Sequence, residues 1–354
     1  MGRKLGPYTL EEVIGRGGMG VVYRARQPST SRDVAVKVIG AAYARQAAFL
    51  RRFEQEAQAG ARLQHPHILP VLDAGVAGGQ PYLVTAYLPG GTLAAQIAAH
   101  PGGLPLDEAV RLSAQLAAAL DYAHAAGVIH CDVKPGNVLL DAQGNAYLAD
   151  FGIARLVDAA NLAELPAPGT YPYTAPEVQQ GQPATPASDV YALGMLVYEM
   201  LVGEPVAERK AGRPPDVTRR RPDVPRGIEV AVGQALHADP AARPPQAGSL
   251  AQALARAGGL PPLRIETPRP PVLDAPPRDA RDQPTNPGAA APAAASPPAP
   301  APALIERLTK VHQPGVPREE PPRRLMWLVW GGLAISFLLL VAVVVLSLGG
   351  RLVF

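Results

Sequence analysis

The sequence predicts an α/β (α+β) domain near the N-terminus, followed by a disordered linker and one membrane-spanning helix. Three observations support this order. Alternating apolar residues and a longer segment with helical spacing occupy the early part of the 354-residue chain. Of its 41 prolines, 18 lie between Pro261 and Pro322. Residues 325–350 then carry no charged side chain.

Two strands are predicted over 8–14 and 21–26, because polar and apolar residues alternate there. The turn between them carries Gly15, Gly17 and Gly20 in a G-x-G-x-x-G pattern. Such glycines let backbone N–H groups approach a phosphate, although the same pattern also opens dinucleotide-binding domains. Those domains need a helix after the glycines, whereas the residues here are β-branched and aromatic and favour a strand. A phosphate-binding hairpin is the better interpretation, with a chance glycine cluster as the alternative.

A third strand is predicted over 34–37, and it ends on Lys37, whose ammonium group could reach phosphate oxygens beneath the hairpin. A single lysine at a strand end is usually only solvated. The next segment, 45–63, has helical apolar spacing and carries Glu54 and Glu56. Because a buried lysine needs an opposite charge, either glutamate is a candidate partner for Lys37.

Composition excludes several kinds of partner and site. A net charge of +3, from 33 basic and 30 acidic residues, is too small to indicate nucleic-acid binding, and only 5% of the residues are aromatic. Cys131 is the only cysteine, which excludes an intramolecular disulfide and a cysteine-based metal site. A single thiol fits a reducing compartment without proving one.

The segment 258–324 predicts a disordered linker. Proline is more than twice as frequent in the chain as the usual share of about 5%. The run APAAASPPAPAPA cannot bury enough apolar surface to offset the entropy of ordering, and polyproline II is its expected conformation. We interpret the segment as a passive tether, and a docking site for proline-binding modules is the alternative.

A membrane-spanning helix is predicted over 325–348. Residues 326–348 would form a helix of roughly 35 Å, enough to cross a hydrocarbon core of about 30 Å. The alternative is a buried core helix, but the segment follows a linker that offers nothing to pack against. The sequence therefore predicts a membrane span.

The flanking charges predict the orientation of this span. Arg323 and Arg324 precede it and only Arg351 follows it, so the positive-inside rule places the N-terminal domain in the cytoplasm. The first ten residues also lack the apolar stretch of a secretory signal. Residues 349–354 would form a short external tail. We therefore expect a single-pass, tail-anchored protein of the cell membrane without an external sensor domain.

Three motifs in the middle of the chain decide the interpretation. They are HCDVKPGN at 130–137, DFG at 150–152 and APE at 175–177. In this order and spacing, after the glycine hairpin and the strand lysine, they resemble the catalytic signatures of a protein kinase over residues 8–256. The Asp-x-Lys-Pro-x-Asn pattern is similar to the Ser/Thr type, and the chain resembles bacterial Ser/Thr kinases of the eukaryotic type. The resemblance implies a two-lobed fold, with a small β-rich lobe, a larger helical lobe and ATP in the cleft between them.

The resemblance assigns roles to the residues of the expected active site. Asp132 would orient the substrate hydroxyl and accept its proton, and Lys134 would steady the transferred group. Asn137 and Asp150 would bind Mg²⁺. The phosphates of ATP would be held by Gly15, Gly17, Gly20 and Lys37, with Glu56, or as second choice Glu54, holding the lysine.

The resemblance also implies an adenine site. Thr85 would act as the gatekeeper, and its small side chain would leave a back pocket open to bulky inhibitors. Thr85, Ala86 and Tyr87 would form the hinge whose backbone bonds the base. Plain core packing is the alternative for the apolar positions that would enclose it. Those positions are Ile14, Val22, Ala35 and Leu139.

Two further matches concern the scaffold. Glu177 and Arg243 resemble the structural ion pair of the family, and Asp189 resembles the aspartate that braces the catalytic loop.

A first departure from the family pattern lies in the catalytic loop and concerns activation by phosphorylation. Cys131 stands where the family usually has an arginine that receives an activation-loop phosphate, and a thiol cannot pair with that dianion. Residues 153–169 contain no Ser, Thr or Tyr, so we expect activity without phosphorylation of this loop. Thr170 resembles instead the residue that bonds the catalytic groups beneath the substrate. Cys131 is interpreted as an inert buried thiol, with oxidation as the alternative.

The segment 203–225 is short and proline-rich, so a helix that relatives use for substrate docking would be shortened or absent. Its arginine run, 219–221, is interpreted as part of a solvated loop, with attraction of acidic substrates or lipid headgroups as the alternative. The resemblance implies phosphorylation of Ser or Thr on cytoplasmic proteins near the membrane, including the chain itself. A pseudokinase scaffold is the alternative. The substrate, the activating signal and dimerisation stay open.

Overall fold

The computed structural model describes residues 3–17, 20–27, 32–151, 172–204, 216–261 and 265. All of these belong to one compact unit, Met1–Thr309, and a second unit, Lys310–Phe354, lies outside the described residues. The predicted span over 325–348, the tail over 349–354, most of the predicted linker and the loop 153–169 also lie outside them. None of the described helices has the length and apolar character that a membrane crossing requires.

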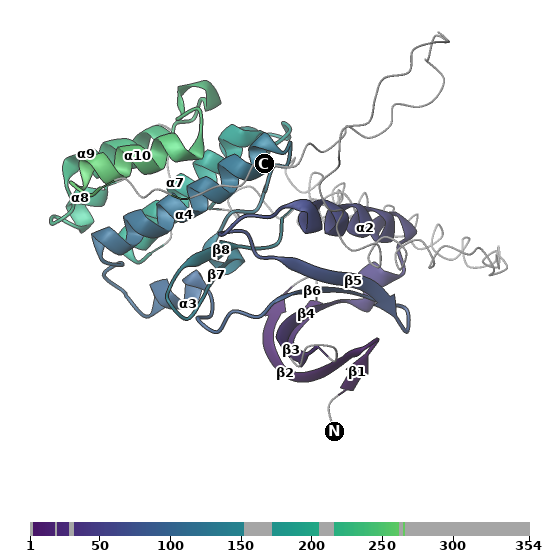
Figure 1. Ribbon diagram of the computed structural model, residues 1–354. Helices are drawn as coiled ribbons and strands as arrows, with labels where there is room; N and C mark the ends of the chain where they lie inside the picture. The colour runs from purple at the N-terminus through teal and green to yellow at the C-terminus, as the bar shows by residue number, and fades with distance from the viewer. Residues whose placement is uncertain are drawn as a thin grey trace, which may run out of the picture. The chain divides into compact units, whose positions relative to one another are not determined.

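Among the described residues, an antiparallel sheet of six strands forms the N-terminal lobe (Figure 1). The predicted hairpin and third strand are confirmed, but the first hairpin strand continues beyond residue 14 to Gly17, which pairs with Gly20. Most of the glycine motif therefore lies on strands. In sheet order the strands are β1 (Arg3–Leu5), β2 (Tyr8–Gly17), β3 (Gly20–Arg26), β4 (Asp33–Ile39), β6 (Gln80–Ala86) and β5 (Val71–Ala77).

The close pairing of β3 with β4 explains one of the glycines. A Cβ atom at Gly20 would lie 2.0 Å from the carbonyl oxygen of Val38. Apart from the chain neighbours of Gly17, no described residue has an atom within 4 Å of a Cβ atom placed there. The close approach of β4 thus requires glycine at position 20. No described contact within the sheet requires glycine at position 17.

Two helices follow β4, α1 (Ala41–Ala44) and α2 (Ala47–Arg62). The second confirms the helix predicted over 45–63. Its buried Phe49 and Phe53 belong to one apolar cluster with Ala74 of β5 and Leu83 of β6, and α2 lies against β5.

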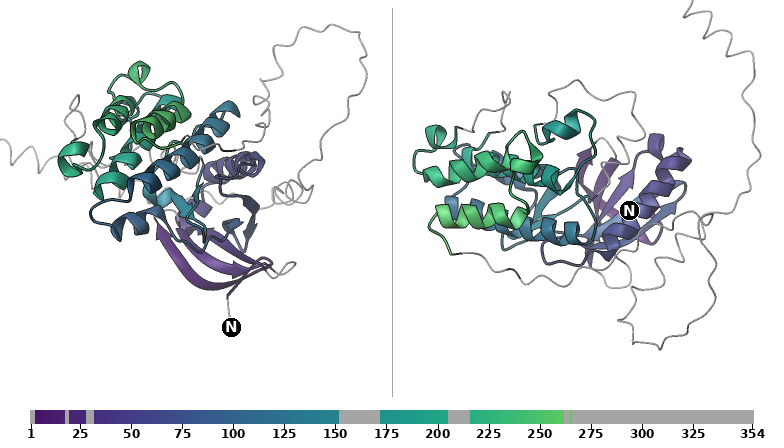
Figure 2. Two further views of the ribbon diagram at one scale, coloured as in Figure 1. Left: turned by 60° about the vertical axis from the view of Figure 1, so that its left-hand side comes forward. Right: turned by 90° about the horizontal axis from the view of Figure 1, so that it is seen from above.

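The C-terminal lobe is mostly helical, and a two-stranded sheet of β7 (Val138–Leu140) and β8 (Ala146–Leu148) lies where it meets the N-terminal lobe (Figure 1). Both views of Figure 2 place α9 and α10 at the far end of the unit from the six-stranded sheet. The helices are α3 (Leu93–Ala98), α4 (Leu106–Ala125), α6 (Pro176–Gln179), α7 (Pro186–Val202), α8 (Val217–Arg220), α9 (Arg226–Ala235) and α10 (Ala247–Ala257), with 3-10 turns at Pro135–Asn137 and Pro240–Ala242.

Helix α7 forms the centre of the helical lobe. Every residue from Ser188 to Val202 is buried, as expected for a helix that is apolar on nearly all sides. The helix begins with a reciprocal capping box between Thr185 and Ser188, and Gly203 ends it in a left-handed conformation with φ 83°. Helices α4, α9 and α10 pack around it, so α7 is a rigid support for the site.

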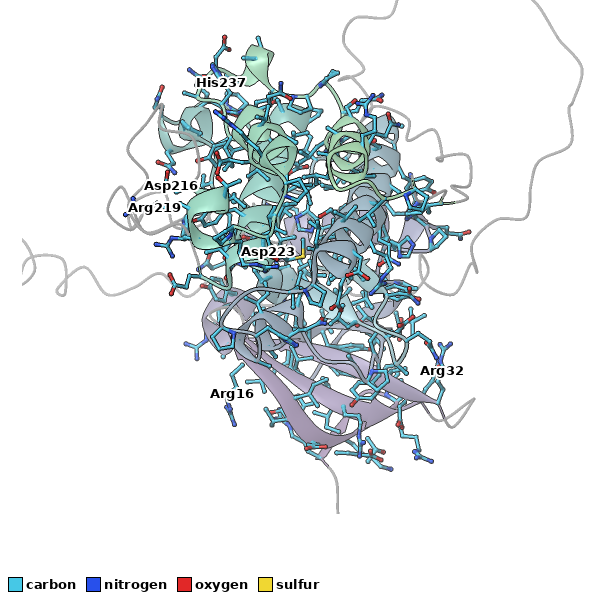
Figure 3. The ribbon with its side chains drawn as sticks, turned by 90° about the vertical axis from the view of Figure 1, so that its left-hand side faces the viewer. Arg16, Arg32, Asp216, Arg219, Asp223 and His237 are labelled. Carbon is cyan, nitrogen blue, oxygen red and sulfur yellow. The ribbon has the colours of Figure 1, made fainter. Side chains whose placement is uncertain are left out.

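The arginine run 219–221 is not uniformly solvated, and that prediction is wrong for Arg221. The side chain of Arg219 is 79% exposed and lies at the edge of the lobe near Asp216 (Figure 3). The side chain of Arg221 is only 16% exposed and pairs with Asp223. Its guanidinium also donates to the carbonyl oxygens of Gly102, Leu104 and Leu201.

Candidate active site

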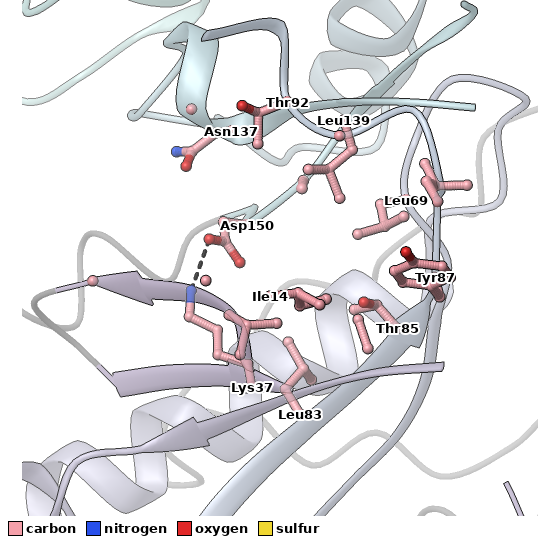
Figure 4. Close-up of a pocket in the computed structure, with 18 of the residues that line it drawn as sticks. Ile14, Lys37, Leu69, Leu83, Thr85, Tyr87, Thr92, Asn137, Leu139 and Asp150 are labelled. Atoms are coloured by element: carbon pink, nitrogen blue, oxygen red, sulfur yellow. Dashed lines mark hydrogen bonds and ion pairs between the residues drawn. The ribbon is translucent and has the colours of Figure 1, made fainter. Parts of the chain in front are cut away.

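A cavity of about 510 Å³ lies between the six-stranded sheet and the β7–β8 end of the helical lobe (Figure 4). Its size falls within the range of about 300–1,000 Å³ that is usual for small-molecule sites. Every site residue predicted from the sequence lines this cavity, apart from Glu56, whose side chain lies outside the described residues. They are Ile14, Gly15, Gly17, Gly20, Val22, Ala35, Lys37, Thr85, Ala86, Tyr87, Asp132, Lys134, Asn137, Leu139 and Asp150.

The loop between α4 and β7 brings three of these side chains together. Lys134 Nζ lies 2.9 and 2.7 Å from the two carboxylate oxygens of Asp132. Asn137 Nδ2 donates to Asp132 Oδ2 and to the backbone carbonyl of Asp132, each at 2.8 Å. The Asp132 side chain is 27% exposed. The carboxylate is therefore oriented by an ammonium and an amide while it stays open to the cavity.

His130 connects this loop to the segment that carries Asp150. The backbone N–H of Asp132 donates to His130 Nδ1 at 3.2 Å, so this nitrogen carries no proton. The Nε2–H group then donates to the carbonyl oxygen of Ala149 at 2.9 Å. The ring packs edge-on against Phe151, with centroids 4.6 Å apart. Both ring nitrogens are thus used to join the two motifs.

Two residues of the site have a left-handed backbone, Cys131 with φ 67° and Asp150 with φ 62°. Conformations of this kind cost about 1–3 kcal/mol each and persist only where neighbouring groups hold them. At Cys131 the holding group is Asp189 of α7, which is 1% exposed. Its oxygens accept from the backbone N–H groups of His130 at 2.8 Å and of Cys131 at 2.9 Å. The predicted brace of the loop is confirmed.

Lys37 projects from β4 into the cavity and forms an ion pair with Asp150, with 2.7 Å between Nζ and Oδ2 (Figure 4). The two side chains are 16% and 33% exposed. The sequence predicted a glutamate as the partner of this lysine. Glu54 forms no ion pair with Lys37 within the described residues, and the side chain of Glu56 lies outside them.

The oxygen donors at this end of the cavity suit Mg²⁺. Because Asn137 binds Asp132 through its Nδ2 group, its Oδ1 atom is left for a cation. Figure 4 shows Asn137 and Asp150 facing the same end of the cavity. In the described part of the chain, no group of three or more His, Cys, Asp or Glu could hold a metal ion. Two protein ligands, completed by phosphate oxygens and water, are the arrangement in which Mg²⁺ is usually bound.

The other end of the cavity is apolar and ends at the segment that leads out of β6. The walls come from β2, β3, β4 and β7, through Ile14, Val22, Ala35 and Leu139. The hydroxyl of Thr85 donates to the carbonyl oxygen of Ala86 at 3.4 Å. A flat apolar ring with polar edges fits between such walls.

Several lining residues were missed by the sequence analysis. Leu69 and Leu83 look like ordinary core positions of a strand pattern, so nothing in the sequence separates them. Thr92 carried a signal, because it follows two glycines and precedes a helix. Its Oγ1 atom accepts from Ala95 N–H at 3.1 Å and caps α3. The other residues missed are Arg16, Leu88, Pro89, Gly91, Gly136 and Ala149.

A second, small cavity of about 30 Å³ lies directly behind Thr85. Thr85, Leu69, Leu83 and Asp150 line both this cavity and the larger one. Phe151 lines only the small cavity. This space is about the size of one water molecule, so a back pocket open to bulky inhibitors stays a prediction.

Glu177 and Arg243 form the predicted ion pair beneath the site. Two guanidinium nitrogens lie 2.7 Å from the two carboxylate oxygens, and Ser188 donates a further bond to Glu177. Burial alone would raise the pKa of Glu177, but the hydrogen bonds and charge of Arg243 hold this pKa below its ordinary value. The pair ties α6 to the segment that precedes α10.

The described geometry agrees with comparisons to known proteins. A family model for the protein kinase domain matches residues 8–229. The chain belongs to the protein kinase family. The kinase is 41% identical over 256 residues to serine/threonine-protein kinase PknK of Mycobacterium bovis, a match that covers 69% of this chain and 23% of PknK. It is 39% identical over 263 residues to PknD of Mycobacterium tuberculosis, covering 71% of this chain and 40% of PknD.

A solved structure shares the fold of this kinase. The crystal structure of the Mycobacterium tuberculosis PknI kinase domain matches with a TM-score of 0.61 and 33% identity, covering 72% of this chain and 98% of that one. The two lobes predicted from the sequence, one rich in strands and one helical, are thereby confirmed. The kinase spans less than half the length of the curated relatives that it matches.

Proposed function

We propose that this kinase transfers the γ-phosphate of Mg-ATP to Ser and Thr hydroxyl groups of proteins. The proposal depends on the convergence of Asp132, Lys134, Asn137 and Asp150 on one cavity that Lys37 also reaches. The relatives are named serine/threonine-protein kinases, which supports the same activity and argues against a pseudokinase scaffold.

Asp132 would bind and orient the substrate hydroxyl. Its carboxylate faces the cavity, and Lys134 and Asn137 fix its direction. In the transfer, the hydroxyl oxygen bonds to the γ-phosphorus, the bond to the leaving oxygen of ADP breaks, and the hydroxyl proton passes to Asp132. Positioning supplies most of the rate enhancement in such reactions, so a well-held carboxylate suffices. Lys134 would offset negative charge on the transferred group.

The glycine-rich strands and Lys37 would bind the phosphates of ATP. The space that the described residues leave at Gly17 would let a phosphate approach the backbone N–H groups of the hairpin. Lys37 now pairs with Asp150, so nucleotide binding would turn its ammonium group toward the phosphates. Glu56 on α2 is the proposed partner that would then hold the lysine. The adenine ring would lie against Leu139 and the other apolar walls.

Bound Mg²⁺ would bridge phosphate oxygens and neutralise their charge. Asn137 would offer its Oδ1 atom and Asp150 its carboxylate. Since Asn137 is 8% exposed and held by Asp132, this ligand is oriented before the cation binds.

We further propose the domain limits predicted from the sequence: the kinase domain over 8–256, the linker over 258–324, the span over 325–348 and the tail over 349–354. This arrangement would keep the kinase domain at the cytoplasmic face of the cell membrane, near protein substrates that include the chain itself. Its support is the proline-rich run and the uncharged segment that follows. The candidate autophosphorylation sites on the linker are Thr267, Thr285, Ser296 and Thr309.

Radiolabelled ATP tests the activity. The full chain, purified in detergent, is incubated with Mg²⁺, γ-labelled ATP and casein, beside an Asp132→Asn variant. We expect label on casein with the wild type, at least about 10²-fold less with the variant, and only phosphoserine and phosphothreonine after hydrolysis. Equal labelling by both proteins would show that Asp132 is not the catalytic carboxylate, and no labelling by either would favour the scaffold.

Membrane fractionation tests the span independently of catalysis. The full chain should stay with the membrane fraction after alkaline carbonate extraction, whereas a chain ending at residue 324 should be released. Release of the full chain would remove the proposed span and leave the activity untouched.

A further inference from the structure

The segment that follows the proposed hinge is bonded to β7 through its backbone. The N–H of Gly90 donates to the carbonyl oxygen of Leu140 at 3.0 Å, and the N–H of Leu140 donates to the carbonyl oxygen of Gly91 at 2.9 Å. Thr92 lies opposite Leu139 in an antiparallel bridge. Leu139 is one of the apolar walls of the cavity. The hinge segment and this wall are therefore joined directly.

Gly90 has no room for a side chain at this junction. A Cβ atom there would lie 2.5 Å from the carbonyl oxygen of Asp141 and 2.6 Å from that of Leu140. Cβ atoms essentially never lie closer than 3.0 Å to such an atom, so the two segments would have to separate by at least 0.5 Å, from 2.5 to 3.0 Å. Gly90 is not among the described glycines with a positive φ. Close contact, and not backbone strain, therefore requires glycine at this position.

The β7 side of the contact is firmly held. Leu140 is 4% exposed and belongs to the apolar core. The carbonyl oxygen of Asp141 accepts from the N–H of Gly144 at 3.1 Å, and Arg111 of α4 donates two bonds of 3.2 Å to the carbonyl oxygen of Gly144. The segment 89–91, by contrast, is exposed. An added side chain would therefore move the hinge segment and leave β7 in place.

We propose that Gly90 is a positioning residue for the base of the nucleotide, a role that rests on the proposed binding of ATP in the cavity. A base whose face lies on Leu139 and whose edge bonds the hinge backbone at 85–87 needs both at fixed places. Gly90 sets their separation because it lets the hinge segment pack directly on β7. Figure 4 shows Lys37 and Asp150 on the other side of the cavity from the hinge, so the phosphate end does not depend on this separation.

Steady-state kinetics of the detergent-purified full chain compare wild type with Gly90→Ala. A gap of about 0.5–1 Å forfeits about a quarter to a half of the attraction between two atoms, and the bonds from the base to the hinge would be misaligned as well. We expect KM for ATP to rise about 10-fold, with kcat at saturating ATP within about twofold of wild type. Gly90→Val, which adds a larger side chain, should raise KM further.

A second nucleotide separates the base from the phosphates. GTP carries the same phosphates, but guanine has a carbonyl group where adenine has an amino group, so it cannot bond the hinge as adenine does. The rate of label transfer to casein at low concentrations of γ-labelled ATP or GTP gives kcat/KM for each. The ratio of kcat/KM for ATP to that for GTP should fall about 10-fold in Gly90→Ala. Equal losses with both nucleotides would place the effect outside the base site and overturn the role.

Gly103→Ala is the matched control. A Cβ atom at Gly103 would lie 2.0 Å from the carbonyl oxygen of Leu201, in the turn before α4 and away from the residues that line the cavity. This variant should lower the midpoint of thermal unfolding at least as much as Gly90→Ala. At temperatures well below that midpoint it should leave KM for ATP and the nucleotide ratio unchanged. If it raises KM as much as Gly90→Ala does, the effect is a general loosening of the fold and the role is wrong.

The remaining outcomes also decide. An unchanged KM in folded Gly90→Ala, or a loss confined to kcat, would refute the role while the wild type is active. A wild type that binds ADP but transfers no phosphate would overturn the proposed function alone, and the role would then require the Kd of ADP to rise about 10-fold in Gly90→Ala. If that variant does not fold, hydrogen exchange of the wild type is the test. The amides of Gly90 and Leu140 should exchange slowly, and rapid exchange at both would refute the junction.

Discussion

Replacing Arg243 with methionine would remove the cation at the base of the helical lobe while keeping an unbranched apolar stem. The Arg243 side chain is fully buried, and its Cζ atom lies 5.0 Å from the centre of the Tyr191 ring. All three guanidinium nitrogens are used. They donate two bonds of 2.7 Å to Glu177 and bonds of 2.8, 3.0 and 3.1 Å to the carbonyl oxygens of His237, Ala187 and Ala238.

The expected destabilisation follows from these contacts. Removing one partner of a buried ion pair costs about 3–5 kcal/mol, because the Glu177 carboxylate would be left without its counter-charge. The three carbonyl oxygens would each lose a donor, worth up to about 1 kcal/mol apiece, although members of one network do not add fully. We expect Arg243→Met to lower the free energy of unfolding by about 5 kcal/mol and the thermal midpoint by about 10–20 °C.

Arg221→Met is the matched control. Arg221 also binds three carbonyl oxygens, but its carboxylate partner, Asp223, is 64% exposed and can be hydrated once the arginine is gone. Its loss should therefore cost only about 1–3 kcal/mol. Urea unfolding followed by circular dichroism measures both variants. The reasoning would be refuted if both variants lost the same free energy of unfolding, or if Arg243→Met lost less than about 2 kcal/mol, because the Glu177 carboxylate left buried without a counter-charge should cost more.

The effect should also depend on pH. The pKa of Glu177 in the folded protein is held below its ordinary value of 4.5. A group with a depressed pKa stabilises the folded state at pH values above its unfolded pKa, and this contribution is lost as the pH falls through the folded pKa. In Arg243→Met the burial of Glu177 remains without the charge of Arg243, so the pKa of Glu177 in the folded variant should lie above its ordinary value. The difference between wild type and Arg243→Met should be constant at pH values above that raised pKa and shrink as the pH falls from there through the lowered pKa of the wild type. A difference that grows on acidification would contradict this linkage.

Three further outcomes are expected. Thr85→Met should fill the small cavity and weaken the binding of ATP-competitive inhibitors with a bulky apolar group by about 10- to 200-fold, with little change in KM for ATP. Equal inhibition of wild type and variant would argue against a back pocket that ligands can enter. Gly20→Ala should lower the free energy of unfolding by about 1–3 kcal/mol or more, because its Cβ atom would meet the carbonyl oxygen of Val38. Gly17→Ala should leave the thermal midpoint unchanged and raise KM for ATP. Phosphatase treatment should leave kinase activity intact, since residues 153–169 offer no hydroxyl group that could be phosphorylated. The expectation would be refuted if mass spectrometry found a phosphate in this loop and its removal abolished activity.

Much of the fold and the site could be predicted because the relevant signals are local. Alternation predicted the hairpin over 8–14 and 21–26, and helical spacing over 45–63 predicted α2. The motifs placed Asp132 and Asp150 at one cavity because their order along the chain is tied to one fold. The first two inferences depend on residues close together in the sequence, and the third depends on the resemblance of several motifs to one family.

The parts that could not be predicted depend on pairs of residues far apart in the chain. Lys37 and Asp150 are 113 positions apart. Their motifs assign phosphate to Lys37 and Mg²⁺ to Asp150, and neither motif predicts that the two side chains pair with each other. His124 Nε2 contacts Asp189 Oδ2 across 65 positions, although a histidine near the end of a helix looks like an ordinary polar residue. Arg221 looked solvated because its neighbours are charged, and only the fold reveals the carbonyl oxygens around it. Periodicity shows which face is buried and not which groups meet there.

The Lys37–Asp150 ion pair affects which species the kinase should accept. A metal ion arriving alone would have to separate the pair and leave the ammonium group of Lys37, a side chain only 16% exposed, without a counter-charge. A nucleotide arriving without metal would place its phosphates beside an unneutralised carboxylate. When metal and nucleotide arrive together, the carboxylate meets a cation and the ammonium meets an anion in the same event. With the roles proposed for Lys37 and Asp150, the resting pair would favour binding of the preassembled metal–nucleotide complex over either component alone.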